Sequence, residues 1–146
     1  MSTQGPITRE EALGRLNELY AEEIEAGLRY LHLAVTLKGL DRLMVRKILL
    51  ENMEETLEHA QLVAEKIVQI GESPTLKIQL NLPAERATGK EALRTALVFE
   101  RAALDAYREL LDRLEGTDDV VLEEFARAQV ALESQHVSEL ELLLED

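Results

Sequence analysis

The chain has 146 residues, with 29 acidic residues against 16 basic ones, for a formal net charge of −13. This length is typical of one domain, and a hydrophobic content of 46% is enough to form a core. The acidity argues against binding to nucleic acid or an anionic membrane, and no apolar run approaches the length of a membrane span. Cysteine is absent, which excludes disulfides and thiolate ligands and fits our expectation of a cytoplasmic protein.

Four segments with apolar residues at three- and four-residue spacing predict four α-helices. We expect the helices at residues 8–38, 41–70, 89–115 and 118–144. Capping boxes of the Thr-x-x-Glu type open the first and third helices: Thr8 with Glu11, and Thr88 with Glu91. The first three helices end before a glycine suited to a left-handed cap: Gly39, Gly71 and Gly116. We expect Asp41 to cap the second helix, and Thr117 or Asp118 to cap the fourth.

The connections between the predicted helices differ in length, and this determines the topology. The first and second helices, like the third and fourth, are joined so tightly that each pair must form an antiparallel hairpin. Residues 71–88, between the hairpins, can run the length of a bundle, and residues 75–82 alternate in polarity as an extended piece does. Two hairpins with one long crossover are the connectivity of a ferritin-like bundle. We therefore predict an all-α four-helix bundle that forms a single domain over residues 1–146.

Polar side chains interrupt the apolar stripe of each helix near its midpoint. They are Glu23, His59, Glu100, Glu133 and His136. Because the helices are similar in length, their midpoints share one level, so these side chains should converge in the core. Burying three carboxylates is costly unless they are paired or bound to a cation, and no lysine or arginine occupies the stripes at this level. Carboxylates combined with imidazoles favour iron, manganese or zinc.

Each of these residues alone also has an ordinary structural explanation. A single glutamate in a stripe is usually a boundary residue, and a single histidine is usually a hydrogen-bonded core or surface residue. A metal-free polar network that fixes the helix register is therefore an alternative, with partners Tyr20, Tyr30, Tyr107 and Gln129. Gln129 lies one turn before Glu133, where it would either hydrogen-bond to that carboxylate or lie at the boundary.

The same residues carry a resemblance to a known family. Residues 16–30 read Leu-Asn-x-Leu-x-x-x-Glu-x-x-Ala-x-x-x-Tyr, which resembles the first-helix signature of the bacterioferritin branch of the ferritin-like superfamily. The matching positions in the other helices are His59-Ala60, Glu100 and Glu133-x-x-His136. The resemblance extends over residues 13–144, nearly the whole chain, and implies a di-iron site between the helices.

The resemblance also implies a role for each residue. Glu23 and Glu100 would be terminal carboxylate ligands, and Glu133 would bridge two metals. His59 and His136 would each bind one metal, and Tyr30 resembles the tyrosine beside the di-iron site. The implied catalytic group is then Glu23, Glu100, Glu133 and Tyr30, with iron as the expected metal and manganese or zinc as alternatives.

The sequence departs from the family's pattern where a second bridging glutamate is expected, three residues before His59. This chain has Thr56 there. Glu55, four residues before His59 and about 40° around the helix, is the candidate substitute ligand. Its register, however, resembles that of a residue facing the exterior of the bundle. A site with one bridge would bind its metal pair less tightly, or would hold one metal well and the other poorly. The departure therefore affects fast ferroxidase chemistry more than metal binding.

Two further departures concern haem and assembly. The methionine through which bacterioferritins bind haem is replaced by Leu57, with Met53 four residues away, so we predict no haem. The chain ends at Asp146, without the fifth helix that lines the pores of twenty-four-subunit shells. We therefore expect a dimer or a twelve-subunit shell. Apolar residues off the stripe of the first helix predict a subunit interface there: Leu28, Leu31, Leu33 and Val35. We expect His32 to be a surface residue.

The leading hypothesis is a ferritin-like protein that oxidises ferrous iron with dioxygen or peroxide, with storage of ferric mineral if it forms a shell. A second hypothesis is a small dimeric di-metal oxidase or peroxidase that stores no iron. A third is a helical interaction scaffold with a degenerate site, for which Thr56 is the motive.

Overall fold

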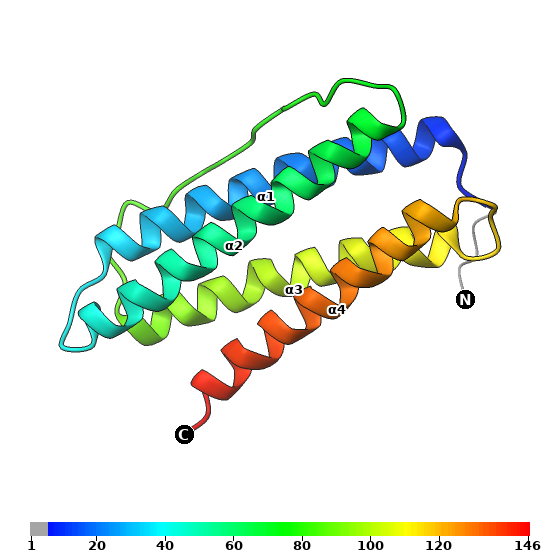
Figure 1. The fold of residues 1–146 in the computed structure, drawn as a ribbon. Coiled ribbons are helices and arrows are strands. Elements are labelled where there is room, and N and C mark those ends of the chain that lie inside the picture. The colour runs from blue at the N-terminus through cyan, green and yellow to red at the C-terminus, as the bar shows by residue number, and fades with distance from the viewer. Residues whose placement is uncertain (1–5) are drawn as a thin grey trace.

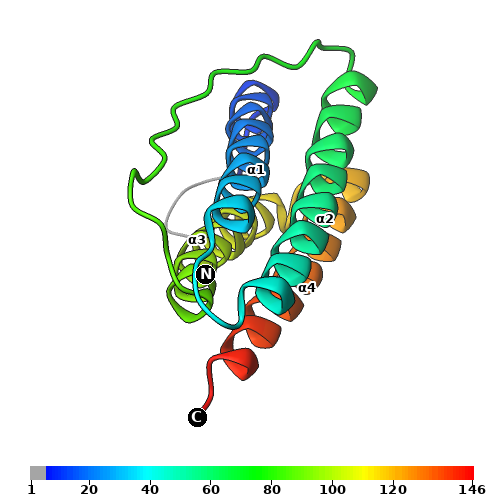
Figure 2. The same cartoon turned by 90° about the vertical axis from the view of Figure 1, so that its left-hand side faces the viewer.

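The computed structural model describes residues 6–146, so the predicted domain start at residue 1 lies outside it. Four helices form the fold: α1 (Arg9–Thr36), α2 (Arg42–Gln69), α3 (Gly89–Leu114) and α4 (Val120–Leu143). Helices α1 and α2 form one antiparallel hairpin and α3 and α4 the other, with the hairpins side by side (Figures 1 and 2). The predicted all-α four-helix bundle is confirmed. Within residues 6–146, no helix is both long and apolar enough to cross a membrane.

The predicted capping boxes of α1 and α3 are both formed. In the first, the backbone N–H of Glu11 donates to Oγ1 of Thr8 over 3.1 Å, and the backbone N–H of Thr8 donates to the Glu11 carboxylate over 3.4 Å. Gly71 and Gly116, with φ values of 89° and 83°, directly follow the C-cap residues of α2 and α3, as left-handed caps require. Gly39 also has a positive φ, of 106°, but it lies in the turn two residues after the C-cap residue of α1. Local sequence signals therefore set the starts of α1 and α3 and the ends of α2 and α3.

Two predicted N-caps are wrong or incomplete. Asp119 caps α4 in place of Thr117 or Asp118, because its carboxylate accepts the backbone N–H of Leu122 over 3.0 Å. Asp41 occupies the N-cap position of α2, but its side chain makes no capping hydrogen bond. A side chain at Gly89 would meet the Asp41 carboxylate, so this carboxylate lies against the start of α3.

The crossover after α2 is fastened along the flank of α1 (Figure 2). Backbone N–H groups of Thr75 and Gln79 donate to side chains of α1, at Asn17 over 2.9 Å and at Glu25 over 3.0 Å. Further along, Nε2 of His32 lies 2.9 Å from the carbonyl oxygen of Pro83. His32 therefore lies outside the core, as predicted, but its half-buried imidazole also contacts the crossover. Residues 75–82 form no strand.

Two apolar clusters divide the core, one on each side of a polar layer. The first contains Leu16, Val63, Tyr107 and Phe125 among others, and the second contains Tyr30, Leu49, Leu93 and Leu140 among others. Between them, six buried polar residues lie on the inner faces of the helices: Glu23, Thr56, His59, Glu100, Gln129 and Glu133. The bundle thus uses apolar packing at both ends to bury a polar centre. Leu143, the last residue of α4, is 48% exposed and lies outside both clusters.

The close approach of α2 to the start of α3 gives a test of this packing. A methyl group at Gly89 would meet the Asp41 carboxylate and lie 2.7 Å from Cγ2 of Val45. Gly89→Ala should therefore lower the free energy of unfolding by about 1–2 kcal/mol. Gly14→Ala, where no atom lies within 4 Å of the new methyl group, should raise it by about 1 kcal/mol. Chemical denaturation measures both, and equal effects would contradict this packing.

Candidate metal centre

The five polar residues predicted to converge do so at the middle of the bundle. Glu23, Glu100 and Glu133 are each 3% exposed or less, and His59 is 6% exposed. His136 is only slightly more accessible, with 11% of its side chain exposed. The two imidazole rings stack, with centroids 5.4 Å apart and planes inclined by 21°. One residue comes from each of α1, α2 and α3 and two from α4, so every helix contributes to the site.

Two groups of candidate metal ligands overlap at one glutamate. Glu23, His59 and Glu133 form the first group, and Glu100, Glu133 and His136 form the second. Within each group, the ligand atoms all lie within 4.8 Å of one another. Nδ1 of His59 is 3.3 Å from Oε2 of Glu23 and 3.1 Å from Oε1 of Glu133. Glu133, the residue that both groups share, is placed as a bridging ligand would be.

Thr56 and Glu55 differ sharply in where they lie. Thr56 is 2% exposed and brings no charge into the core. Glu55 keeps 53% of its side chain exposed, yet its Oε2 lies 2.7 Å from Nε2 of His136. The other ring nitrogen of His136, Nδ1, is 3.7 Å from Oε2 of Glu100. His136 therefore has one edge toward the buried glutamates and the other toward Glu55.

Tyr30 contacts the site directly. Its hydroxyl donates to Oε1 of Glu100 over 2.6 Å, and the ring is fully buried. Burial, together with the charge of Glu100, raises the pKa of the phenol, so it stays a hydrogen-bond donor at neutral pH. Asn52, to which we had assigned no role, also interacts with the Tyr30 hydroxyl. Its position as a polar residue within the apolar stripe of α2 was the sequence signal that could have identified it as part of the site.

Several buried polar atoms of the site have no hydrogen-bond partner among residues 6–146. They are Oε2 of Glu23, Oε2 of Glu133 and Nδ1 of His136, together with the Tyr107 hydroxyl and Oε1 of Gln129. Buried polar atoms are nearly always paired, so three such atoms on candidate ligands fit a cation better than a self-sufficient network. Gln129 is 2% exposed, so it does not lie at the boundary, and its amide oxygen Oε1 is one of these atoms without a partner.

The electrostatics of the metal-free cluster also depend on burial. Burial disfavours charge on His59, but the Glu133 and Glu23 carboxylates outweigh it and raise the pKa of the imidazole to about 10. Glu100 raises the pKa of His136 to about 9. Burial raises the pKa of Glu133 to about 8 and also raises that of Glu23. The pKa of Glu100 is held at about 2, because the His136 imidazole and other donors outweigh its burial. Protons thus stabilise the cluster when no metal is bound.

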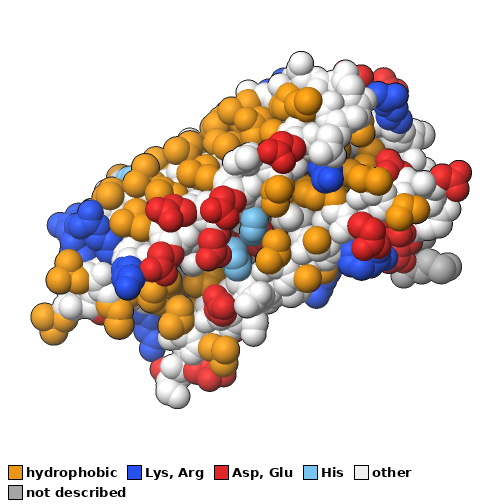
Figure 3. Space-filling model, in the orientation of Figure 1, with side chains coloured by type: hydrophobic (Ala, Val, Ile, Leu, Met, Phe, Trp, Pro, Cys, Tyr) orange, Lys and Arg blue, Asp and Glu red, His pale blue; other side chains and the backbone are white. Residues whose placement is uncertain are grey.

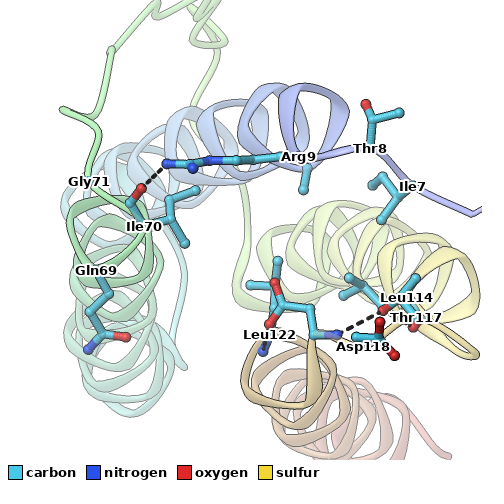
Figure 4. A pocket seen from close by; sticks show the side chains of 12 residues that line it. Ile7, Thr8, Arg9, Gln69, Ile70, Gly71, Leu114, Thr117, Asp118 and Leu122 are labelled. Atoms are coloured by element: carbon cyan, nitrogen blue, oxygen red, sulfur yellow. Dashed lines mark hydrogen bonds between the residues drawn. The ribbon is translucent and has the colours of Figure 1, made fainter.

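The site reaches the surface between α2 and α4. Figure 3 shows two histidine side chains side by side in the middle of this face, with acidic side chains around them. A separate pocket of about 580 Å³ lies at the end of the bundle, where α1 and α4 begin (Figure 4). Its wall includes Ile7, Leu114 and Leu122, and Arg9 donates across its rim to the carbonyl oxygen of Ile70. None of the candidate ligands lines this pocket, so it is separate from the candidate metal centre.

Metal binding should release protons and strengthen with pH. Metal ligation needs neutral imidazoles and ionised carboxylates, whereas His59, His136 and Glu133 hold protons up to pH values of about 10, 9 and 8. Between pH 6 and 8, each displaced proton should raise the apparent affinity by about tenfold per pH unit. Calorimetric titration with Zn²⁺, in two buffers that differ in ionisation enthalpy, counts the protons. A binding heat independent of the buffer would contradict the placement of these protons.

The comparison with known proteins agrees with this geometry. The family described as "Ferritin-like domain" matches residues 13–146. No curated protein sequence matches the chain.

Solved structures share the fold over most of their length. A ferritin-like, diiron-carboxylate protein from Bacillus anthracis str. Ames is 25% identical, with a TM-score of 0.82 over 95% of this chain and 100% of that one. The bacterioferritin-related protein of Bacteroides fragilis, described as a dodecameric thioferritin, is 24% identical, with a TM-score of 0.82 over 92% of this chain and 84% of that one. Rhodobacter capsulatus bacterioferritin is 22% identical, with a TM-score of 0.78 over 94% of this chain and 85% of that one.

The family match covers all four helices and both groups of candidate ligands. The chain therefore belongs to the ferritin-like domain family, and its buried glutamates and histidines lie in the centre of that family's bundle.

Proposed function

We propose that this protein is a ferritin-like iron protein that binds ferrous ions between its helices and oxidises them, with dioxygen or peroxide as the electron acceptor. The observation that carries the proposal is the pair of ligand groups that meet at Glu133, with unpaired buried atoms on Glu23, Glu133 and His136. The Bacillus anthracis relative described as a diiron-carboxylate protein supports the same chemistry.

The donor set suits this reaction for a physical reason. Imidazole nitrogen binds ferrous iron well, whereas carboxylate oxygens favour the harder ferric product, so a mixed site stabilises the product of oxidation. Glu23 and His59 would hold one metal, Glu100 and His136 the other, and Glu133 would lie between them. The Tyr30 hydroxyl, which donates to Glu100 over 2.6 Å, would orient that carboxylate.

Removing a shared or terminal ligand should slow ferrous oxidation. We expect Glu133→Ala and Glu100→Ala to reduce the initial rate by at least about tenfold, because each loses a charged ligand from a buried site. Glu54→Ala, which removes an exposed carboxylate of the same helix as His59, is the matched control and should oxidise iron at the unaltered rate. The rate is followed by the absorbance of the ferric product.

Equal rates in the unaltered protein and all three variants would rule out oxidation at this site. If the purified protein also held no stoichiometric metal after growth with added iron, the interaction scaffold would be the better hypothesis. Thr56 is the one observation that favours that alternative.

We also propose that the protein is a homo-oligomer, formed in part through the outer face of α1. Leu28, Leu31 and Val35 are 38%, 41% and 47% exposed and share this face, as predicted. Figure 3 shows hydrophobic side chains gathered along the upper edge of the molecule. Leu33, the fourth predicted interface residue, is instead 4% exposed and packs in the core, so that prediction is wrong. The dodecameric state described for the Bacteroides fragilis relative favours a twelve-subunit shell.

The mass of the particle in solution distinguishes storage from a purely enzymatic role. We expect light scattering after size exclusion to give a multiple of the 16.5 kDa chain mass, with twelve subunits favoured. Leu31→Glu should lower this mass, because a charge cannot be buried unpaired at an interface. Val98→Glu places a charge at a residue of α3 that is 69% exposed and should leave the mass unchanged. A dimer that holds iron would favour the oxidase hypothesis, and a monomer would contradict the proposed assembly.

A further inference from the structure

The charge of the buried site is unbalanced if two divalent cations bind there. Glu23, Glu100 and Glu133 are the only carboxylates in the two ligand groups found among residues 6–146. Three negative charges leave one of the four positive charges uncompensated, and His59 and His136 must be neutral to act as ligands. An uncompensated charge in a low-dielectric interior is strongly disfavoured. One further anion near the site, either a side chain or a bound hydroxide, would balance this charge.

The position facing the bundle interior cannot supply that group. Thr56 is 2% exposed, and its hydroxyl and methyl groups occupy the place on α2 from which a carboxylate would bridge. A threonine hydroxyl carries no charge at neutral pH. A fourth carboxylate would have to come from another direction.

Glu55 lies on the side of His59 opposite to Thr56, where a carboxylate can approach the site. In the part of the chain that the structure describes, it is the one carboxylate outside the ligand groups that lies within 4.0 Å of a site imidazole. Its Oε2 is 2.7 Å from Nε2 of His136. Because it precedes His59 by four residues, it points about 40° away from that residue, toward α4.

Resting on the proposed metal centre, we infer that Glu55 is a positioning residue that acts through His136. Its carboxylate accepts a hydrogen bond from Nε2 of His136, turns Nδ1 toward Glu100 and Glu133, and adds a negative charge beside the second metal position from the solvent side. The site is then asymmetric. The first position, with Glu23, His59 and Glu133, is built from side chains that are already buried and held in place. The second position must order a side chain that is 53% exposed, at a cost in conformational entropy. The first position therefore binds metal more tightly than the second.

This inference explains Thr56 and Glu55 together, because α2 has an uncharged residue at the buried position and a carboxylate at the neighbouring exposed position. A carboxylate on the outer nitrogen of His136, at the solvent-exposed seam between α2 and α4, would offset part of the charge of the second cation through the imidazole. The second position lies beside this seam and would exchange its metal with solvent more readily than the first. A symmetric site with two buried bridging carboxylates would not distinguish its two metals in this way.

Titration with Co²⁺, followed by its visible absorption, tests the inference without any measurement of activity. We expect the unaltered protein to bind two Co²⁺ ions per chain in two unequal steps. Glu55→Gln should leave the first step unchanged and weaken the second by at least about tenfold. Glu54→Gln, the neighbouring exposed carboxylate, is the control and should behave like the unaltered protein.

A double variant moves the carboxylate to the interior position. Glu55→Gln combined with Thr56→Glu should restore two tightly bound Co²⁺ ions, because the charge returns on the other side of His59. Helical circular dichroism and the melting temperature show whether each variant is folded. If Thr56→Glu does not fold, the comparison of Glu55→Gln with Glu54→Gln decides the question alone.

The outcomes separate this inference from the proposed function. Two unchanged Co²⁺ steps in Glu55→Gln would overturn the role of Glu55 and leave the metal centre standing. A single Co²⁺ step in the unaltered protein, or the loss of both steps in Glu55→Gln, would overturn the asymmetric two-position site. Failure of the unaltered protein to bind Co²⁺ at all would instead contradict the proposed function.

Discussion

The cost of burying carboxylates at the centre of the bundle is the constraint on which the rest of the structure depends. Glu23, Glu100 and Glu133 lie where a helical bundle would ordinarily place leucine, and each is almost fully buried. Without metal, protons shared with His59 and His136 reduce the repulsion, which is why the pKa values of both imidazoles lie well above the usual range. In the proposed metal-bound state, the same groups would become ligands. The site is thus poised between two ways of neutralising one set of charges.

The rest of the bundle offsets the free-energy cost of burying these carboxylates. Apolar clusters above and below the polar layer supply the hydrophobic stabilisation, and the capped helix ends fix where each helix starts. The crossover, hydrogen-bonded to Asn17, Glu25 and His32, covers one flank of α1 and leaves the seam between α2 and α4 free. The site consequently opens at the side where His136 and Glu55 meet. The metal centre is accessible because it lies at this seam between two helices, and not because a pocket leads to it.

Sequence reasoning was sufficient for features governed by local or periodic rules. The capping boxes, the glycine caps, the four stripes and the level at which the polar residues meet all follow from spacing along a helix. Features that depend on a second element could not be read in this way. The contact of His32 with Pro83 was missed because the path of the crossover was unknown, and Leu33 was expected at an interface because its packing in the core was unknown. The side-chain direction of Glu55 likewise depends on α4, which no periodicity of α2 reveals.

Thr56, the residue that raised doubt about the metal site, also bears on why its two proposed metal positions differ. Thr56 first suggested a degenerate metal site, because the family's pattern has a bridging carboxylate at this position. The contact between Glu55 and His136 changes this argument, since the missing charge is found one residue away and on the other side of His59. With Thr56 uncharged and Glu55 exposed, the negative charge of this part of α2 lies toward solvent. In the proposed centre this placement would weaken one metal position selectively, which suits a centre that receives and passes on ions better than one that holds a permanent pair.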